Sequence, residues 1–393
     1  MTQPVLAVRD LCTSFATPRG PLRAVDGVDL ELDAGETLCL VGESGCGKSV
    51  TALSILRLLP EPPAKIERGE VLFEGRDLRR MSDEELRQLR GNRIAMIFQE
   101  PMTSLNPVFR IGDQIEEALR VHRTLGRAER QARVLELLEL VGIPDARARM
   151  RDYPHQLSGG MRQRVMIAMA LANDPAVLIA DEPTTALDVT IQAQILELLD
   201  ALKRRFRMAV LLITHDLGVV AETAQRVAVL YAARVVEMGT VEQIFRAPQH
   251  PYTRGLLDAL PSARVHPGEP LNVIAGRVPD LVARPKGCSF RERCPRALAI
   301  CAEADPGLGP GRGGARVACH NPVPAPGAES CARRCSRCAG CPRASRCVRT
   351  ASADGCAWSR SRASTSTWSR GRPWAWSVNR AVASRRWRGW RCG

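Results

Sequence analysis

Residues 35–49 read GETLCLVGESGCGKS, and this stretch decides the fold. An apolar strand at 38–41 runs into the pattern GxxxxGKS at 42–49, and a helical pattern follows at 50–59. A phosphate-binding loop requires this order of strand, loop and helix. Its glycines let the backbone wrap closely with the N–H groups turned inward, and the helix start adds the positive end of its dipole. The stretch therefore predicts a site for nucleotide phosphates.

The side chains of this loop predict how a nucleotide is held. Lys48 is placed to reach the β- and γ-phosphates, and the Ser49 hydroxyl to bind Mg²⁺. A glycine-rich turn with an accidental match is the alternative, and the complete motif in its full context argues against it. We interpret Cys46 as a tolerated small residue and not as a redox switch. The predicted ATP-binding residues of the loop are Gly42, Glu43, Ser44, Gly45, Cys46, Gly47, Lys48 and Ser49.

A second apolar strand carries two carboxylates at its end, in the sequence AVLIADE at 176–182. Asp181 suits the Mg²⁺ shell, and Glu182 is placed to polarise an attacking water as a general base. Ordinary surface acids at a strand end are the alternative, but the sequence PTTALD at 183–188 follows directly. None of the four lysines follows an asparagine, so the Asn-Lys-x-Asp guanine reader is absent and a GTPase is disfavoured.

A second candidate anion site precedes that strand, in LSGGMRQR at 157–164. Ser158 is a good helix N-cap, and Gly159 and Gly160 expose backbone N–H groups at the start of a helical pattern over 165–173. This second site has no lysine of its own. A lone SGG would be a weak signal, but its spacing before AVLIADE makes it strong.

These motifs, present and in order, resemble those of ATP-binding-cassette ATPases over residues 5–245. The resemblance implies an ATPase of the α/β P-loop class, with a mostly parallel sheet, a small antiparallel sheet at the start and a helical subdomain over about 100–170. It also implies roles for single residues. Phe15 would stack on adenine, Gln99 would contact Mg²⁺ and the water, Ser158, Gly159 and Gly160 would clamp ATP bound to the opposite subunit, Asp188 would lie at the dimer interface, and His215 would contact the γ-phosphate.

Two of these roles have competing interpretations. Phe15 could equally belong to the core. His215 would by default be a surface or hydrogen-bonded histidine, but its place in LLITHD, after a strand at 210–214, favours the γ-phosphate role.

The resemblance further implies partners. Two cassettes, identical or related, would close head to tail on two ATP and drive transmembrane permease subunits. An extracytoplasmic solute-binding protein would deliver the solute to these subunits. The stretches QEPMTSLNP (99–107), QHPYTRGLLDALP (249–261) and GCSFRERCP (287–295) are similar to the importer branch for peptides and nickel. We therefore expect a peripheral subunit at the cytoplasmic face of a membrane. The solute itself, and whether the cassette pair is homo- or heterodimeric, stay open.

An extension at 246–325 follows the cassette and contains Cys288, Cys294, Cys301 and Cys319. Four thiols in a cytosolic chain argue for metal over disulfide, but the spacing is not that of a zinc ribbon. Ligation of a [4Fe–4S] cluster is chemically reasonable, and the resemblance implies it for this branch. Buried free cysteines and zinc stay open as alternatives.

The formal net charge of +14 belongs to the end of the chain. Residues 331–393 hold fifteen Arg and one acid, whereas residues 1–330 hold 41 basic and 41 acidic side chains. The net charge therefore gives no argument for a nucleic-acid partner of the folded part. The N-terminal sequence has no secretory pattern, and no apolar run approaches the roughly 18 residues that span a bilayer.

The tail at 326–393 shows no helix or strand period, and we interpret it as out-of-frame and disordered. Plausible codons for WSVNRAVASRR at 376–386, read in another frame, spell VGESGCGKST, a second phosphate loop. An Arg/Trp-rich arm that binds nucleic acid is the alternative interpretation. A non-transport cassette ATPase of the translation or DNA-repair type is the other rival, although such chains usually carry two cassettes or a coiled-coil insertion.

Overall fold

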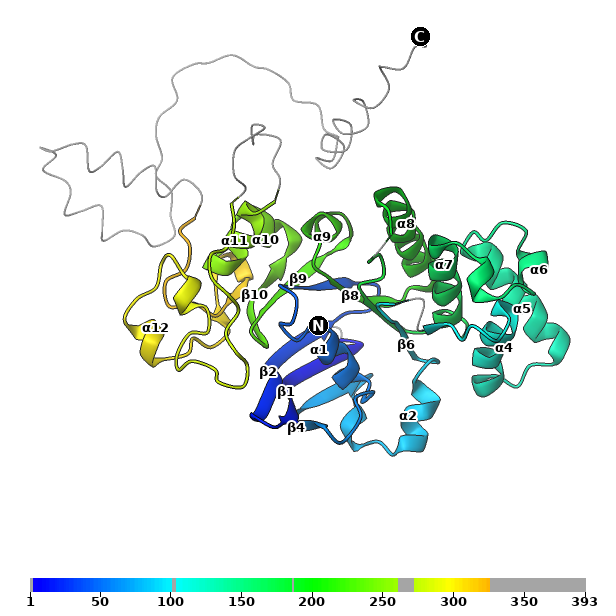
Figure 1. Cartoon of the computed structure of the whole chain (residues 1–393), viewed down its shortest axis with the longest axis horizontal. Helices are drawn as coiled ribbons and strands as arrows, with labels where there is room; N and C mark the ends of the chain where they lie inside the picture. Colours follow the sequence, from blue (N-terminus) through cyan, green and yellow to red (C-terminus); the bar gives the residue numbers. More distant parts are fainter. Residues whose placement is uncertain (1–2, 101–103, 186, 261–271, 326–393) are drawn as a thin grey trace, which may run out of the picture. The chain divides into compact units, whose positions relative to one another are not determined.

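The structure is a computed structural model that describes residues 3–100, 104–185, 187–260 and 272–325 (Figure 1). The described residues form two sheets with helices around them. One sheet has eight strands in the order β11-β12-β10-β9-β3-β8-β7-β6, and the other has four in the order β2-β1-β4-β5. The tail at 326–393 and residues 101–103 of the QEPMTSLNP stretch lie outside the described residues.

The centre of the eight-stranded sheet is parallel. β3 pairs in parallel with both β8 and β9, and β7 pairs in parallel with both β8 and β6. The parallel strands are β3 (Thr37–Val41), β6 (Ile94–Ile97), β7 (Val177–Asp181), β8 (Ala209–Thr214) and β9 (Arg226–Tyr231), and β10 (Arg234–Thr240) pairs antiparallel with β9. Their order explains why the two predicted site strands matter together, since parallel neighbours end at one edge of the sheet.

Alternate residues of these strands enter two hydrophobic cores, one on each face of the sheet. In β3, Cys39 and Val41 belong to one core, and Leu38 and Leu40 to the other. The strands β7 and β8 alternate in the same way. A strand buried on both faces must be apolar throughout, which is why these segments read as continuous apolar runs rather than as alternating ones.

The four-stranded sheet is antiparallel and comes from the start of the chain. Its strands are β1 (Leu6–Thr17), β2 (Gly20–Leu32), β4 (Ala64–Phe73) and β5 (Arg76–Asp77). β1 lies in the middle, between β2 and β4. The predicted small antiparallel sheet at the start is therefore confirmed.

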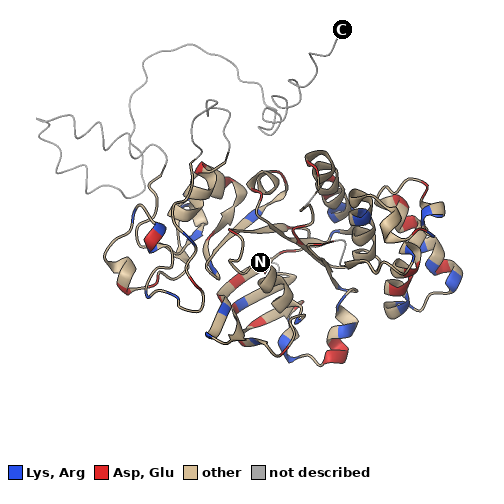
Figure 2. Ribbon diagram, in the orientation of Figure 1, with Lys and Arg blue, Asp and Glu red and all other residues tan. Residues whose placement is uncertain are grey.

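Helices connect and cover the sheets. α1 (Lys48–Ile55) follows β3, and α8 (Val189–Phe206) and α9 (Leu217–Thr223) follow β7 and β8. α2 (Asp83–Leu89) begins with a capping box, in which Ser82 and Glu85 satisfy each other's backbone N–H groups. The region of the predicted helical subdomain contains α4 (Ile111–His122), α5 (Arg127–Leu140), α6 (Ala146–Arg149) and α7 (Gly159–Ala170). In these helices acidic and basic residues are interspersed (Figure 2).

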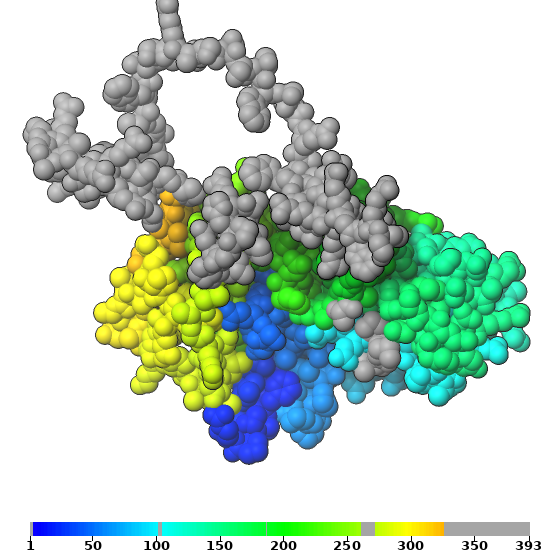
Figure 3. Space-filling model, turned by 45° about the horizontal axis from the view of Figure 1, so that its top comes forward, coloured from blue at the N-terminus to red at the C-terminus, as the bar shows by residue number. Residues whose placement is uncertain are grey.

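The helix α10 (Val241–Arg246) leads into the extension, which is built from short elements and two added strands. They are α11 (Pro251–Asp258), the 3₁₀ helices η3 (Arg291–Arg293) and η4 (Arg312–Gly314), α12 (Ile300–Glu303), β11 (Gly309–Pro310) and β12 (Arg316–Val317). β12 pairs antiparallel with β10, so the extension continues the main sheet. The surface of the extension adjoins that of the N-terminal strands (Figure 3).

A buried carboxylate fastens α11 to the sheet. Glu237 of β10 is 1% exposed and accepts hydrogen bonds from the backbone N–H groups of Gln249 (2.6 Å) and His250 (2.9 Å). Burial raises the pKa of Glu237 and lowers that of the fully buried His250 to about 3, so His250 is neutral. No helix of the described residues is long and apolar enough to cross a membrane.

Candidate functional site

The phosphate loop, residues 42–49, is held where only glycine fits at two positions. Gly42 has φ 155° and Gly47 has φ 105°. A Cβ atom would lie 2.2 Å from the Leu230 carbonyl oxygen at Gly42, and 2.1 Å from the Ala24 carbonyl oxygen at Gly47. The loop therefore wraps against the backbone of β2 and β9, and this contact fixes its path.

The lysine of the phosphate loop is hydrogen-bonded to two backbone carbonyls of the same loop. Lys48 is buried, and its Nζ donates to the carbonyl oxygens of Gly42 (2.9 Å) and Glu43 (3.0 Å). Ser44 and Gly45 are exposed at the tip. Cys46 is fully buried, and burial raises the pKa of its thiol, which makes it a poor nucleophile.

The first carboxylate of AVLIADE reaches the loop. Asp181 ends β7 and accepts a hydrogen bond from the Ser49 hydroxyl at 3.1 Å. Burial raises the pKa of Asp181, and the Ser49 hydrogen bond partly offsets that rise. A hydroxyl and a carboxylate are oxygen ligands of the kind that Mg²⁺ takes, so the donor set fits this ion.

The other two predicted catalytic residues, Gln99 and His215, converge on Glu182. Its carboxylate accepts from the Gln99 amide (3.0 Å) and the Thr185 hydroxyl (2.8 Å), and it lies 3.1 Å from Nδ1 of His215. The residue has φ 46°, a left-handed conformation that is strained for a residue with a Cβ. Three strands thus deliver one cluster, since Gln99 follows β6, Glu182 follows β7 and His215 follows β8.

The same contacts set the charge of Glu182. Burial by itself would raise its pKa, but the hydrogen bonds from His215 and Thr185 outweigh burial and hold the pKa below the ordinary value. Glu182 is therefore ionised at neutral pH and can accept a proton or orient a water.

Ser158 of the LSGG segment, residues 157–160, caps α7 as predicted, but the helix covers Gly159–Ala170 rather than 165–173. The Ser158 hydroxyl caps the helix by accepting from the Met161 N–H. A Cβ at Gly160 would lie 2.8 Å from the Ile191 side chain of α8. Asp188 caps α8 by accepting from the N–H groups of Thr190 and Ile191. α1 and α7 are set apart in Figure 1, so the two predicted anion sites are not joined within the chain.

Phe15 lies in β1, where it pairs with Leu22 of β2 and Ala64 of β4. Its side chain is half-buried, outside the two cores. A ring in this position can offer a face to a base, so stacking on adenine stays a prediction.

The four cysteines of the extension gather in one place. Burial raises the pKa of Cys319 to about 11, and the neighbouring thiolates of Cys294, Cys288 and Cys301 add to the rise. The Cys288 N–H also donates to the Cys301 carbonyl (2.8 Å). Among the described residues, however, no group of three or more His, Cys, Asp or Glu is arranged to hold a metal ion.

The sequence motifs did not identify three residues that contact the site. Thr185 lies within the quoted PTTALD stretch, and its hydrogen-bonding hydroxyl three residues after Glu182 was the available signal. Tyr252 and Arg293 lie in the extension, and both reach Glu43 of the phosphate loop. Their separation of more than 200 residues from Glu43 left no local signal.

Two protein families match parts of the chain. Residues 25–185 match the ABC transporter family, and residues 236–301 match the oligopeptide/dipeptide transporter C-terminal region. The chain is 56% identical over 315 residues to a probable peptide ABC transporter ATP-binding protein of Sinorhizobium fredii, which covers 80% of this chain and 94% of that protein. It is 54% identical over 303 residues to the dipeptide transport ATP-binding protein DppD of Bacillus subtilis, covering 77% and 90%.

Solved structures agree with these relatives. A dimeric ATP-binding cassette in a post-hydrolysis state, bound to ADP and Pi, superposes with a TM-score of 0.54 at 28% identity, over 60% of this chain and 98% of that one. The protein cbiO1 of Clostridium perfringens, part of an ABC transporter complex, superposes with a TM-score of 0.53 at 26% identity, over 63% and 92%.

Proposed function

Because the chain belongs to the ATP-binding subunits of peptide ABC transporters, we propose that it hydrolyses ATP to power the import of dipeptides or oligopeptides. Its fold is the α/β P-loop cassette, and its activity is that of a transporter ATPase. The non-transport ATPase and nucleic-acid interpretations lose their basis, because these relatives are peptide transport proteins. A related small solute such as nickel stays open.

The observation that carries the ATPase proposal is the convergence on Glu182 beside the phosphate loop. Gln99, Thr185 and His215 orient its carboxylate, while Ser49 and Asp181 are joined next to Lys48. A general base needs a fixed direction and an ionised carboxylate, and Glu182 has both.

We assign the residues the following work. Lys48 exchanges its two carbonyl partners for the β- and γ-phosphates of ATP, and the N–H groups of the loop accommodate the rest of the triphosphate. Glu182 then takes the proton from a water that Gln99 positions, and His215, which lies beside Glu182, contacts the γ-phosphate. Ser49, Asp181 and Gln99 would hold Mg²⁺, which neutralises charge on the phosphate oxygens.

The LSGG segment supports a composite site. Ser158, Gly159 and Gly160 start α7 away from the chain's own phosphate loop, so they would face ATP bound to a second cassette, with Asp188 at the same interface. The dimeric state of the similar cassette bound to ADP and Pi supports this arrangement. Permease subunits, a solute-binding protein outside the membrane and a position at its cytoplasmic face complete the proposed assembly.

A [4Fe–4S] cluster on Cys288, Cys294, Cys301 and Cys319 stays a separate proposal. The gathering of the four thiols supports it, and the lack of a formed metal site among the described residues speaks against it. Iron and acid-labile sulfide analysis of anaerobically purified protein decides the matter. Stoichiometric iron and sulfide would support the cluster. Zinc alone would show that the four cysteines bind zinc instead, and the absence of metal would contradict the proposal.

The function is tested with the full chain, its permease and its binding protein in liposomes. We expect peptide-stimulated ATP hydrolysis and peptide uptake, and we expect Glu182→Gln to keep ATP binding while turnover falls at least about 100-fold. Glu197→Gln, on the exposed face of α8, is the matched control and should keep full activity. Full turnover in Glu182→Gln would contradict its role, and uptake of nickel but not peptide would redirect the solute.

A further inference from the structure

Arg293 of the extension is bonded to the phosphate loop with all five of its N–H groups occupied. Its two terminal nitrogens donate to the two carboxylate oxygens of Glu43, at 2.8 Å and 3.0 Å. The remaining donors go to the carbonyls of Ala275 and Ile274 and to the Tyr231 hydroxyl. The guanidinium is therefore held rigidly, in the bidentate geometry that gives the strongest ion pairs.

The cation of this ion pair is shielded from water, whereas the Glu43 side chain is 26% exposed. The Arg293 side chain is 6% exposed, and its guanidinium lies over the rings of Tyr231 and Phe290, at 5.8 Å and 6.0 Å from their centroids. Burial and two aromatic faces hold the cation in place. Because one partner is buried, solvent and salt screen this pair less than they screen a fully exposed one.

The loop is also held at its backbone. The N–H of Glu43 donates to the hydroxyl of Tyr252 at 2.9 Å, and Tyr252 is fully buried in α11. The carbonyl oxygen of Glu43 accepts a hydrogen bond from Nζ of Lys48. Glu43 thus joins the extension on one side and the phosphate-binding lysine on the other.

A second contact leads from the extension to the far side of the loop. Arg284 donates to the carboxylate of Asp26 and to the carbonyl of Ala232, in the turn between β9 and β10. The next residue of that turn, Ala233, donates its N–H to the Cys46 carbonyl at 3.0 Å. The extension therefore contacts the phosphate loop directly at Glu43, and indirectly at Cys46 through the turn between β9 and β10.

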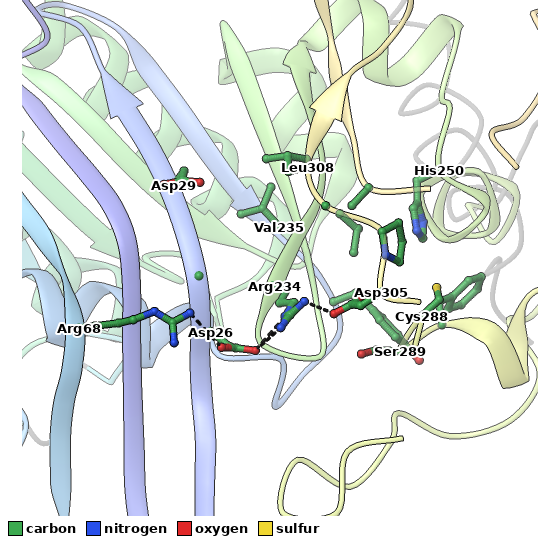
Figure 4. Close-up of a pocket in the computed structure, with 17 residues that line it drawn as sticks. Asp26, Asp29, Arg68, Arg234, Val235, His250, Cys288, Ser289, Asp305 and Leu308 are labelled. Atoms are coloured by element: carbon green, nitrogen blue, oxygen red, sulfur yellow. Dashed lines mark hydrogen bonds and ion pairs between the residues drawn. The ribbon is translucent and has the colours of Figure 1, made fainter. Parts of the chain in front are cut away.

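The charges around Asp26 continue this network along a cavity of about 260 Å³ (Figure 4). Arg68 and Arg234 both pair with Asp26, and Arg234 also pairs with Asp305 of the extension. Burial would raise the pKa of Asp26, but its hydrogen bonds from Arg234 and Arg284 hold that pKa below the ordinary value. These carboxylates and guanidinium groups pair with one another, so we interpret the network as a support rather than as a binding site.

We propose that the extension presets the phosphate loop for ATP through the ion pair between Arg293 and Glu43, which makes Arg293 a positioning residue for nucleotide binding. The proposal rests on the proposed ATPase function. Its physical basis is that Glu43 places a carboxylate inside a loop that must receive a triphosphate. Arg293 neutralises that charge and holds the carboxylate on the side of the extension.

Removing one partner of such a pair differs from removing both. Arg293→Ala leaves the Glu43 carboxylate unpaired beside the incoming phosphates, whereas the double variant with Glu43→Gln leaves no charge there. Arg293→Lys keeps the charge but cannot form the bidentate contact. The three variants therefore separate charge from geometry.

The experiment measures Mg-ATP affinity by calorimetry, together with kcat and KM, on the full chain. We expect Arg293→Ala to raise Kd and KM for ATP about tenfold with kcat within about twofold. Arg293→Lys should raise both about threefold, and the double variant should recover most of the affinity lost in Arg293→Ala.

Arg291→Ala is the matched control, because Arg291 lies in the same 3₁₀ helix but donates to the carbonyls of Lys286 and Ala302 within the extension. It should leave Kd unchanged. The proposal is overturned if Arg293→Ala binds ATP like the wild type, if Arg291→Ala weakens binding equally, or if the double variant shows no recovery. Should Arg293→Ala not fold, wild-type affinity in Arg293→Lys overturns it. No ATP binding by the wild type would overturn the ATPase function as well.

Discussion

The phosphate loop and the LSGG segment both place glycines at the start of a helix, but only the loop is enclosed by its own chain. At Gly42 and Gly47 a Cβ would meet backbone carbonyls at 2.2 Å and 2.1 Å, and at Gly160 it would meet the Cγ2 methyl of the Ile191 side chain at 2.8 Å. The loop also has its lysine and the two contacts from the extension to Glu43.

The comparison indicates that the phosphate loop is shaped by contacts within its own chain, whereas the LSGG segment depends on a ligand from outside the chain. Backbone contacts cannot move aside, so the loop keeps one shape before nucleotide arrives. The segment instead offers N–H groups and a serine to a ligand that another cassette would bring. Substitutions of the loop glycines should therefore affect folding and binding, and substitutions of the segment glycines should affect turnover.

The largest effect should come from Gly47→Ala. The added methyl would overlap the Ala24 carbonyl at a position with φ 105°, so we expect a loss of about 3 kcal/mol in the free energy of unfolding and no detectable ATP binding. Chemical denaturation and calorimetry measure the two effects. Gly45→Ala is the control, because its Cβ would meet nothing within 4 Å and only the strain of φ 78°, about 1 kcal/mol, remains. Equal losses in the two variants would show that close approach does not shape the loop.

A substitution in the LSGG segment should spare binding and reduce turnover. We expect Gly160→Ala to bind Mg-ATP like the wild type but to hydrolyse it about 100-fold more slowly, because the composite site is misaligned. Mixing it with Lys48→Ala should restore activity that neither has alone, since one of the two sites then combines an intact loop with an intact segment. Activity that stays lost in the mixture would contradict the head-to-tail arrangement.

A smaller effect should appear in the pH profile. The pKa of Glu182 lies below its ordinary value, so wild-type turnover should be flat near neutral pH and fall only as acid protonates this carboxylate. His215→Ala removes a hydrogen bond that lowers the pKa, and the acid limb should therefore move to higher pH. Rate–pH profiles of kcat report this shift. An unmoved limb, together with reduced kcat, would place the role of His215 elsewhere.

The smallest effect should come from the helix cap of the LSGG segment. Ser158→Ala removes the hydroxyl that accepts from the Met161 N–H, at a cost of about 1 kcal/mol in the free energy of unfolding. Urea denaturation measures it. Asp188→Ala should cost a similar amount, because Asp188 caps α8 in the same way. A much larger loss in either variant would mean that these residues support more than one helix end.

Most of the core of the site could be predicted from the sequence because its residues lie in short motifs. The strand at 38–41, the two carboxylates at the end of β7 and the cap at Ser158 follow from spacing and local propensity, and the structure confirms all three elements. The helix after the loop begins at Lys48 and ends at Ile55, rather than covering 50–59, because element ends depend on caps and packing. The role of Phe15 and the cluster on the four cysteines remain predictions.

The sequence by itself determined the loop, the carboxylates and the helix cap at Ser158, since each depends on neighbours a few residues away. Only the tertiary structure decided that Gln99, Thr185 and His215 meet at Glu182, and that Arg293 bonds to Glu43. The first follows from parallel strands ending at one edge, and the second from β12 returning the extension to the main sheet. Contacts between residues up to 250 positions apart depend on how the whole chain packs, and no local pattern encodes them.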